Sequence, residues 1–350
     1  MNAVPAIRAL GIDKWFGRTC AVAGADVTVP VGSIVALLGP SGSGKSTLLR
    51  IIAGFEVPDA GMVEIDGGRV AGEGTWVEPE LRRVGMVFQD GALFPHLTVE
   101  RNVAFGEPAP GRVTECLELV GLAHRARSYP HELSGGERQR IALARALAPD
   151  PAVVLLDEPF AALDAGLRAA LREDVAAILR EAGATALLVT HDQQEALSLA
   201  DEVVLMDAGR IVQTGTPEEV YARPANRWVA GFLGAAEVFP GTASHGYVET
   251  EFGRLLSDDP CAQGPVEVMI RPEVLSLVPL AADADAAGAS VSGEVLNRSF
   301  FGHDQLVTLE LRSGRRVRSR VHGVTRWQPG DLVGIRVDGP VHVLPSSDRV

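Results

Sequence analysis

Cysteine is scarce in this chain, and long apolar runs are missing from it. The three cysteines, Cys20, Cys116 and Cys261, are odd in number, far apart and in no C-x-x-C pair, so neither a disulfide framework nor a zinc site is predicted. No run approaches the roughly 18 consecutive apolar residues of a membrane span. The first residues, Met1–Leu10, lack the basic start and apolar stretch of a secretory signal. We therefore expect the protein to work in the cytosol.

Basic charge is also in short supply. Lys and Arg number 32 against 45 Asp and Glu, which gives a formal net charge of -13. Nonspecific nucleic-acid binding depends on a basic surface, so no nucleic-acid partner is expected. A local arginine cluster is interpreted as the solvated face of a hairpin rather than as an anion site; it comprises Arg315, Arg316, Arg318 and Arg320.

A glycine-rich loop at Gly39–Ser46 fits the pattern G-x-x-x-x-G-K-[ST]. The apolar run before it is typical of a buried strand and Thr47–Ala53 after it has helical spacing, which is the context that the motif requires. Backbone N–H groups of such a loop surround phosphates, Lys45 would reach the β/γ-oxygens, and the Ser46 hydroxyl would bind Mg²⁺. A plain glycine-rich turn is the alternative, which the context disfavours. The expected phosphate-binding residues are Gly39, Pro40, Ser41, Gly42, Ser43, Gly44, Lys45, Ser46 and Thr47.

Two adjacent carboxylates, Asp157 and Glu158, follow the apolar run Val153–Leu156. Ligands collect at the carboxyl ends of parallel strands. There Asp157 would hold Mg²⁺, and Glu158 would accept a proton from the attacking water as general base. A surface turn formed by Asp-Glu-Pro is the alternative.

Gln89 and His191 each follow a further apolar run, so we expect them at the same edge of the sheet. A lone glutamine or histidine at a strand end is usually only solvated. The neighbouring motifs favour contact with the nucleotide instead.

The octapeptide Leu133–Arg140 reads LSGGERQR and stands between the phosphate loop and the Asp157-Glu158 pair. In this order the motifs resemble those of the ATP-binding cassette (ABC) ATPases. The resemblance implies that Ser134, Gly135 and Gly136 face the γ-phosphate of ATP held by a second copy, as expected of a helix N-terminus. A head-to-tail dimer with two composite sites is therefore expected.

The same resemblance assigns further roles. Gln89 would be the Q-loop residue, which touches Mg²⁺ and the attacking water and senses a membrane partner, and His191 would contact the γ-phosphate. Asp164 matches the D-loop, which crosses the dimer interface. Phe16, before Gly17, occupies the place of the aromatic residue that stacks on adenine; Trp15 is the rival, and packing in the core is the alternative for either ring.

With 350 residues and 46% hydrophobic content, the chain is long and apolar enough for two domains. The predicted fold class is α/β: residues 1–236 form a P-loop core with a mostly parallel sheet and a helical subdomain at about 90–151. Residues 237–350 form a small antiparallel β-barrel with regulatory and dimerisation roles. A short Ala/Asp-rich linker occupies 281–290.

This second domain resembles the oligonucleotide-fold-type TOBE module of bacterial solute importers, on Ile270–Glu273, Gly293–Val295 and Phe301–His303. Importer ATPases are also indicated by Phe94–Val99, Tyr129–Glu132 and Thr214–Tyr221. Among importer ATPases, the chain is most similar to those for ferric iron; the segments that carry this similarity are Gly91–Phe94, Val99–Ala104 and Glu237–Gly241. The resemblance implies MgATP as the substrate complex, separate transmembrane permease subunits, an extracytoplasmic solute-binding protein, and a peripheral location at the cytoplasmic face of the membrane.

Alternatives remain within the superfamily. The solute could be a polyamine, a quaternary amine, sulfate or a sugar, and a non-transport ABC ATPase is a further reading. Repair-type members insert a long coiled coil between Lys45 and Ser134, which this chain lacks. Three departures from the usual motifs, Ser43, Glu137 and Ala161, remove no phosphate-binding or proton-handling group, so two complete sites per dimer are expected.

Overall fold

The computed structural model describes residues 4–161, 165–280, 291–324 and 327–345. The chain divides into two compact units, residues 1–218 and 219–350. Among the described residues, no helix has both the length and the apolar character that a membrane crossing requires.

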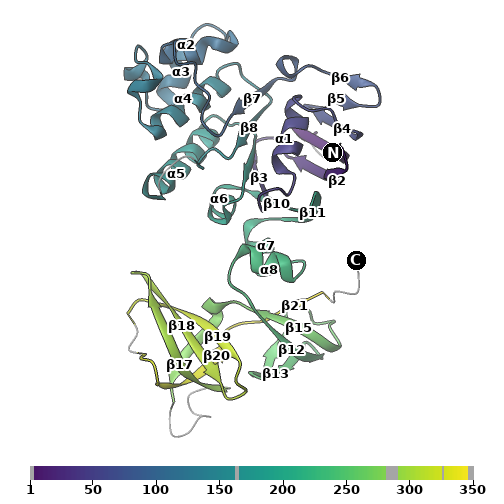
Figure 1. Ribbon diagram of the computed structural model, residues 1–350, viewed down its shortest axis with the longest axis vertical. Coiled ribbons are helices and arrows are strands. Elements are labelled where there is room, and N and C mark those ends of the chain that lie inside the picture. The colour runs from purple at the N-terminus through teal and green to yellow at the C-terminus, as the bar shows by residue number, and fades with distance from the viewer. Residues whose placement is uncertain (1–3, 162–164, 281–290, 325–326, 346–350) are drawn as a thin grey trace. The chain divides into compact units, whose positions relative to one another are not determined.

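A six-stranded sheet organises the first unit (Figure 1). Its order is β11-β10-β3-β9-β8-β7; β10, β3, β9, β8 and β7 pair in parallel and β11 is antiparallel. Every residue of β3 and β9 is buried, which explains why these strands read as continuous apolar runs instead of alternating ones. The strands are β3 (Ile34–Leu38), β7 (Val84–Val87), β8 (Val153–Asp157), β9 (Ala186–Thr190), β10 (Glu202–Asp207) and β11 (Arg210–Gly215).

An antiparallel sheet and helix α1 (Lys45–Ala53) share one apolar core with the six-stranded sheet. The order of this second sheet is β2-β1-β4-β5-β6. Leu48, Leu49, Ile51 and Ile52 of α1 are fully buried there, so the helix that follows the phosphate loop is held firmly. The strands are β1 (Ile7–Phe16), β2 (Thr19–Val29), β4 (Ala60–Ile65), β5 (Gly68–Gly72) and β6 (Thr75–Trp76).

Helices cover a second core of the unit, which includes Ile34, Leu156 and Leu188 of the six-stranded sheet. In Figure 1 the labels α2, α3 and α4 lie together, away from the antiparallel sheet. This is the helical subdomain that the sequence predicts, and it contains α4, the helix that begins in the signature residues. The helices are α2 (Val99–Val103), α3 (Arg112–Leu119), α4 (Gly135–Leu147), α5 (Ala165–Glu181) and α6 (Gln193–Leu199), with 3-10 turns at Pro79–Leu81, Ala104–Gly106, Ala123–Arg125 and Pro130–Glu132.

The second unit contains two five-stranded antiparallel sheets around one apolar core. Their orders are β14-β13-β12-β15-β21 and β16-β20-β17-β18-β19. The predicted fold class, an α/β core with a helical insertion and a small antiparallel β domain, is therefore confirmed. The strands are β12 (Glu237–Ser244), β13 (Tyr247–Thr250), β14 (Gly253–Leu256), β15 (Gly264–Ile270), β16 (Leu275–Pro279), β17 (Val291–Phe300), β18 (Asp304–Leu311), β19 (Arg316–His322), β20 (Leu332–Val337) and β21 (His342–Leu344), with a 3-10 turn at Pro272–Val274.

Helix α7 (Pro217–Ala222) crosses the boundary between the two units along the chain, and α8 (Arg227–Leu233) belongs to the second unit. Arg271, only 5% exposed, donates to the backbone oxygens of Tyr221, Ala230 and Ala235. The second compact unit begins at Glu219, so it includes the later part of α7 and all of α8. The boundary that the sequence suggests, with one domain at 1–236 and the other at 237–350, stays a prediction.

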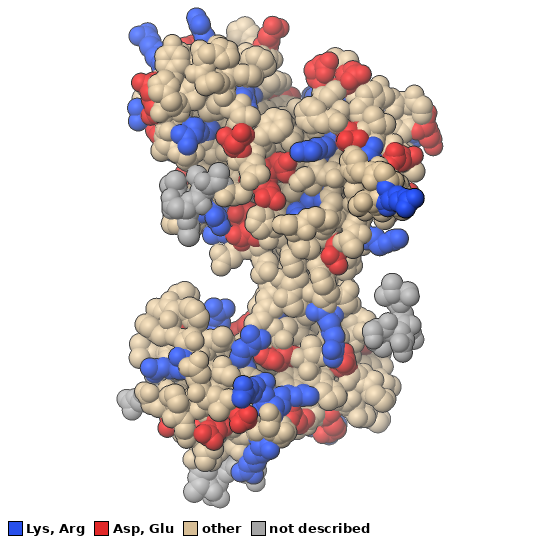
Figure 2. All heavy atoms as spheres, viewed as in Figure 1, with Lys and Arg blue, Asp and Glu red and all other residues tan. Residues whose placement is uncertain are grey.

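The arginine cluster on and before β19 is paired with carboxylates. Arg318 lies 2.8 Å from Glu237, and Arg315 lies 3.3 Å from Glu251. Arg316 is paired with Glu310 and Arg320 with Asp304. Figure 2 shows acidic and basic side chains interspersed on the visible face of this unit. This pairing supports the interpretation of the cluster as a solvated hairpin face.

Candidate functional site

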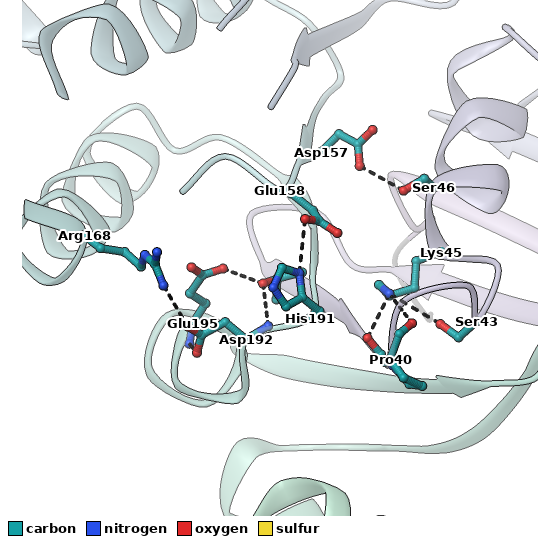
Figure 3. Close-up of polar contacts among 12 residues, drawn as sticks. Pro40, Ser43, Lys45, Ser46, Asp157, Glu158, Arg168, His191, Asp192 and Glu195 are labelled. Carbon is teal, nitrogen blue, oxygen red and sulfur yellow. Dashed lines mark hydrogen bonds and ion pairs between the residues drawn. The ribbon is translucent and has the colours of Figure 1, made fainter. Parts of the chain in front are cut away.

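The carboxyl ends of four adjacent parallel strands carry the predicted polar residues. The phosphate loop follows β3, His191 follows β9, Glu158 follows β8, and Gln89 comes after β7 with one residue between them. Figure 3 shows Lys45, Asp157, Glu158 and His191 together at this edge. The sequence predicts this convergence because parallel strands end at the same edge of a sheet.

The backbone of the phosphate loop depends on its glycines. Gly42 and Gly44 have φ of 81° and 103°, in the left-handed region. A Cβ at Gly44 would collide with the carbonyl oxygen of Ala21, so a larger residue there would force the loop to move. Helix α1 begins at Lys45, and its N-cap residue Gly44 provides no side-chain cap. Its first N–H groups can therefore serve an anion.

Lys45 is the buried cation of the site, with 4% of its surface exposed. Its ammonium donates to the carbonyl oxygens of Gly39 and Pro40, each at 2.8 Å, and to Ser43 Oγ at 3.4 Å. Burial lowers the pKa of Lys45, and the nearby Glu158 and Asp157 oppose that shift. All three acceptors are neutral, so the loop holds a positive charge that a phosphate can neutralise.

Ser46 and Asp157 form the second part of the site, with Ser46 Oγ donating to Asp157 Oδ1 at 3.2 Å (Figure 3). Burial is the largest influence on Asp157 and raises the pKa of its carboxyl, against the hydrogen bond from Ser46. Hydroxyl and carboxylate oxygens are the ligands that Mg²⁺ prefers, and adjacent ligands of one octahedral Mg²⁺ lie about 3 Å apart. The two side chains therefore fit a magnesium ion. Within the described part of the chain, no group of three or more His, Cys, Asp and Glu side chains is arranged to hold a metal ion; phosphate oxygens and water would be the further ligands of a bound Mg²⁺.

Glu158 and His191 contact each other, with His191 Nδ1 3.1 Å from Glu158 Oε2 (Figure 3). The Glu158 backbone has φ of 45° although the residue is not glycine. Its N–H donates to the carbonyl oxygen of Val189 at 2.9 Å, which holds this unfavourable conformation in place. Non-glycine residues in such conformations concentrate at functional sites and cost roughly 1–3 kcal/mol.

Three residues that sequence reasoning missed fix the backbone on both sides of His191. Asp192 caps α6 by accepting from the N–H groups of Gln194 and Glu195 at 2.8 and 3.3 Å. Thr190 Oγ1 accepts from the Asp192 N–H at 3.0 Å and donates to the Glu195 carboxyl, whose pKa is raised chiefly by burial. The spacing Asp-x-x-Glu ahead of an apolar helix could have indicated this cap.

The signature residues begin helix α4 in a capping box. Ser134 Oγ accepts from the Glu137 N–H at 3.2 Å, and the Glu137 carboxylate accepts from the Ser134 N–H at 2.8 Å. Arg125 Nε lies 3.3 Å from the same carboxylate. Ser134 is exposed and Gly136 is buried, so the hydroxyl lies at the surface while the turn behind it is packed.

The remaining predicted residues lie apart from this cluster. Gln89 is exposed beyond the end of β7. Phe16 and Trp15 are 49% and 52% exposed, so packing in the core is wrong for both rings, and the ammonium of Lys14 lies 5.3 Å from the Phe16 ring centre. Asp164 lies outside the described residues.

A groove of about 880 Å³ lies beside the segment that follows Gln89. Its apolar lining includes Phe88, Phe94 and Phe105, and its polar lining includes Arg145. The rings of Phe94 and Phe105 are 4.3 Å apart. Phe105 and Arg145 carry no motif signal, so the sequence alone did not place them here.

A glycine loop with a buried lysine, a serine–aspartate pair and a glutamate–histidine pair at one sheet edge define a P-loop nucleotide hydrolase. The chain belongs to the family of ABC transporter ATP-binding proteins. Residues 22–161 match the ABC transporter family model, and residues 268–344 match the TOBE domain. These matches confirm both resemblances that the sequence motifs carry.

Individual proteins agree with this family. The Fe(3+) ions import ATP-binding protein FbpC 1 of Rhodococcus jostii is 46% identical over 347 residues, covering 96% of this chain and 98% of the relative. Among solved structures, CbiO1 of Clostridium perfringens, part of the transporter complex CbiONQ, has a TM-score of 0.57 and 29% identity, covering 63% of this chain and 92% of its own. The dimeric ATP-binding cassette MJ0796 bound to ADP and Pi has a TM-score of 0.51 and 30% identity, covering 60% and 98%.

Proposed function

We propose that this protein is the ATP-hydrolysing subunit of a bacterial importer and that the imported solute is ferric iron. The observation that carries the ATPase role is the convergence of the phosphate loop, Asp157, Glu158 and His191 at one sheet edge. Curated relatives support the solute, because FbpC proteins 40–46% identical to this chain are named for Fe(3+) import.

The residues of the sheet edge divide the chemistry between them. The phosphate loop and Lys45 bind the triphosphate, and Phe16 stacks on adenine with its half-exposed ring. Ser46 and Asp157, with Gln89, hold Mg²⁺, which neutralises phosphate charge when bound. Glu158 accepts the proton of the attacking water, and His191 donates a hydrogen bond to the γ-phosphate.

ATP is hydrolysed between two copies of the chain. Ser134, Gly135 and Gly136 of one copy approach the γ-phosphate bound by the other, with Asp164 at the interface. A helix N-terminus suits this task, because its N–H groups and its dipole favour negative charge. The dimeric ADP-bound cassette among the structural neighbours supports the assembly, and a two-fold interface makes both sites equivalent.

Membrane subunits couple to the groove beside residues 90–97. Its aromatic lining and its position after Gln89 suit a short amphipathic helix of the permease. The chain would then lie at the cytoplasmic face of the membrane as a peripheral subunit, and an extracytoplasmic binding protein would select the solute. CbiO1 supports this organisation, as part of a transporter complex.

Uptake measurements test the proposed solute. Cells that lack the chromosomal gene for this chain should lose uptake of radiolabelled ferric iron, and a plasmid with the wild-type chain should restore it. A plasmid carrying Lys45→Ala should not. Iron uptake that is unaffected by the deletion, with loss of sulfate, polyamine, quaternary amine or sugar uptake, would reject iron and retain the ATPase role.

A further inference from the structure

The segment that follows Gln89 is bonded to the signature helix. Arg145, in the last turn of α4, donates to the carbonyl oxygens of Ala92 at 2.7 Å and Gly91 at 3.0 Å. Its guanidinium also lies 5.5 Å from the centre of the Phe94 ring. Two bonds from one planar guanidinium to successive carbonyls restrict that backbone more than a single bond could.

The backbone at this point needs such support. Gly91 and Ala92 have φ of 73° and 42°, both left-handed, a conformation that is unfavourable for the non-glycine residue Ala92. Gly91 packs closely on α4: a Cβ there would lie 3.5 Å from the Gln139 side chain and 3.7 Å from the Ala142 side chain. The segment is therefore bonded to α4 and packed against it.

A second set of hydrogen bonds holds the same segment further along the chain. Asn102 of α2 is fully buried, and its amide accepts from the Phe94 N–H at 2.8 Å and donates to the Phe94 carbonyl at 3.2 Å. It also donates to the carbonyl oxygens of Leu97 and Thr98, at 3.1 and 3.0 Å. Both ends of the segment are thus held by the helical subdomain.

Helix α4 connects the bonds made by Arg145 to the signature residues. It runs from Gly135 to Leu147, and 13 residues of helix are about 20 Å long. Ser134 caps one end of the helix, and Arg145 grips Gly91 and Ala92 from the other. In the proposed function, Ser134 serves the ATP of the partner and Gln89 serves the ATP of its own chain.

We infer that Arg145 is a positioning residue that couples the two ATP sites of the dimer. ATP bound by the partner displaces the Ser134 end of α4 and so moves the helix. Arg145 passes that movement to Gln89, which contacts the ATP bound by its own chain. The inference rests on the proposed dimer, and it predicts that ATP hydrolysis is cooperative only while Arg145 holds the segment.

Three variants of the purified full-length chain test this inference. Arg145→Ala removes both bonds and the ring contact, and Arg145→Lys keeps a charge that can reach only part of them. Arg140→Ala is the matched control: Arg140 belongs to the same helix but lies 3.6 Å from Asp174 of α5. The measurements are binding of a fluorescent ATP analogue, kcat, and the Hill coefficient for ATP.

Analogue affinity should stay within about twofold of wild type in all three variants, because the phosphate loop is untouched. For Arg145→Ala, kcat should fall about tenfold or more and the Hill coefficient should approach 1, as expected when the coupling between the sites is lost. Both quantities should be intermediate for Arg145→Lys. Arg140→Ala should resemble wild type.

Other outcomes overturn the inference. An equal loss of analogue binding and hydrolysis in the Arg145 variants would reveal a merely structural role. If Arg145→Ala does not fold, the measurements on Arg145→Lys decide the question. Two results would contradict this inference but leave the proposed function intact. The first is hydrolysis that is cooperative in wild type and remains cooperative in Arg145→Lys and Arg145→Ala. The second is wild-type hydrolysis without cooperativity. A wild-type chain that binds ATP without hydrolysing it would overturn the proposed function as well.

Discussion

His191 Nδ1 lies 3.1 Å from Glu158 Oε2 at the end of two neighbouring parallel strands. The register of β8 and β9 sets this contact, since Asp157 pairs with Val189 and Glu158 donates its N–H to the same residue. The proposed base and the proposed γ-phosphate ligand are therefore positioned by one sheet. Moving either side chain away requires only rotation about its own bonds, not rearrangement of the strands.

Glu158→Gln should retain MgATP binding but lose hydrolysis. The amide has nearly the same size as the carboxyl and can still bond His191, yet it cannot accept a proton at neutral pH. Because a general base contributes about 10²–10⁴-fold to a rate, kcat should fall at least about 100-fold. ATP should then accumulate a stable dimer in size-exclusion chromatography. Near-normal turnover, with only monomer in the presence of ATP, would reject the base assignment.

The grouping of the proposed nucleotide-binding residues at one sheet edge could be predicted from sequence because their motifs are local. The loop around Lys45 and the Asp157-Glu158 pair each lie on one strand end, and parallel pairing brings those ends together. Arg271 and Arg145 could not be predicted, since their backbone partners lie 36–54 residues away in the chain. Contacts of this kind also decide how the chain divides into compact units, because the bonds from Arg271 tie α8 to the second unit.

Glu137, one of the departures from the usual motifs, should make the stability of α4 depend on pH. The backbone hydrogen bond from Ser134 is the largest influence that lowers the pKa of Glu137, and Arg125 adds to it. Because the folded pKa lies below the ordinary value of 4.5, the stabilisation is present above that value and is lost as the pH falls through the folded pKa.

Glu137→Gln should accordingly lower the free energy of unfolding by about 0.3–1 kcal/mol at pH 7, as for a charge at a helix N-terminus. The difference from wild type should shrink below about pH 4.5, where the wild-type carboxyl becomes protonated. Denaturant unfolding of the nucleotide-free protein at both pH values measures this. An equal difference at pH 7 and in acid would show that the charge of Glu137 does not stabilise the helix.

A cysteine at Ala92 should form a cross-link with the membrane subunit. Ala92 is exposed and lines the groove beside Phe94, so a coupling helix in that groove would lie within reach of the thiol. Cross-linking of membranes that contain the assembled transporter provides the measurement. The native thiol of Cys261, exposed in the second unit, is an internal control and should remain unlinked. Capture of the membrane subunit through Cys261 instead would place the coupling surface on the second unit.

Gly136→Asp should disable the ATP site of the partner chain, although the phosphate loop of the variant is intact. A carboxylate at this helix start would face the γ-phosphate, and like charges at close range repel strongly in a desolvated site. Gly136→Asn is the matched control, since it adds a side chain of similar size without the charge, and it should retain more activity than Gly136→Asp.

Mixing two inactive variants tests whether the signature acts across the dimer. In a heterodimer of Gly136→Asp with Lys45→Ala, one composite site carries both lesions and the other is wholly native, because a two-fold interface pairs the loop of each chain with the signature of its partner. Mixtures should hydrolyse ATP above the level of either variant alone when one native site suffices for turnover. Strict coupling between the sites could suppress hydrolysis, so nucleotide trapping in the heterodimer is measured in parallel. If neither hydrolysis nor trapping recovers in a mixture shown to contain heterodimers, Ser134–Gly136 does not complete the site of the partner.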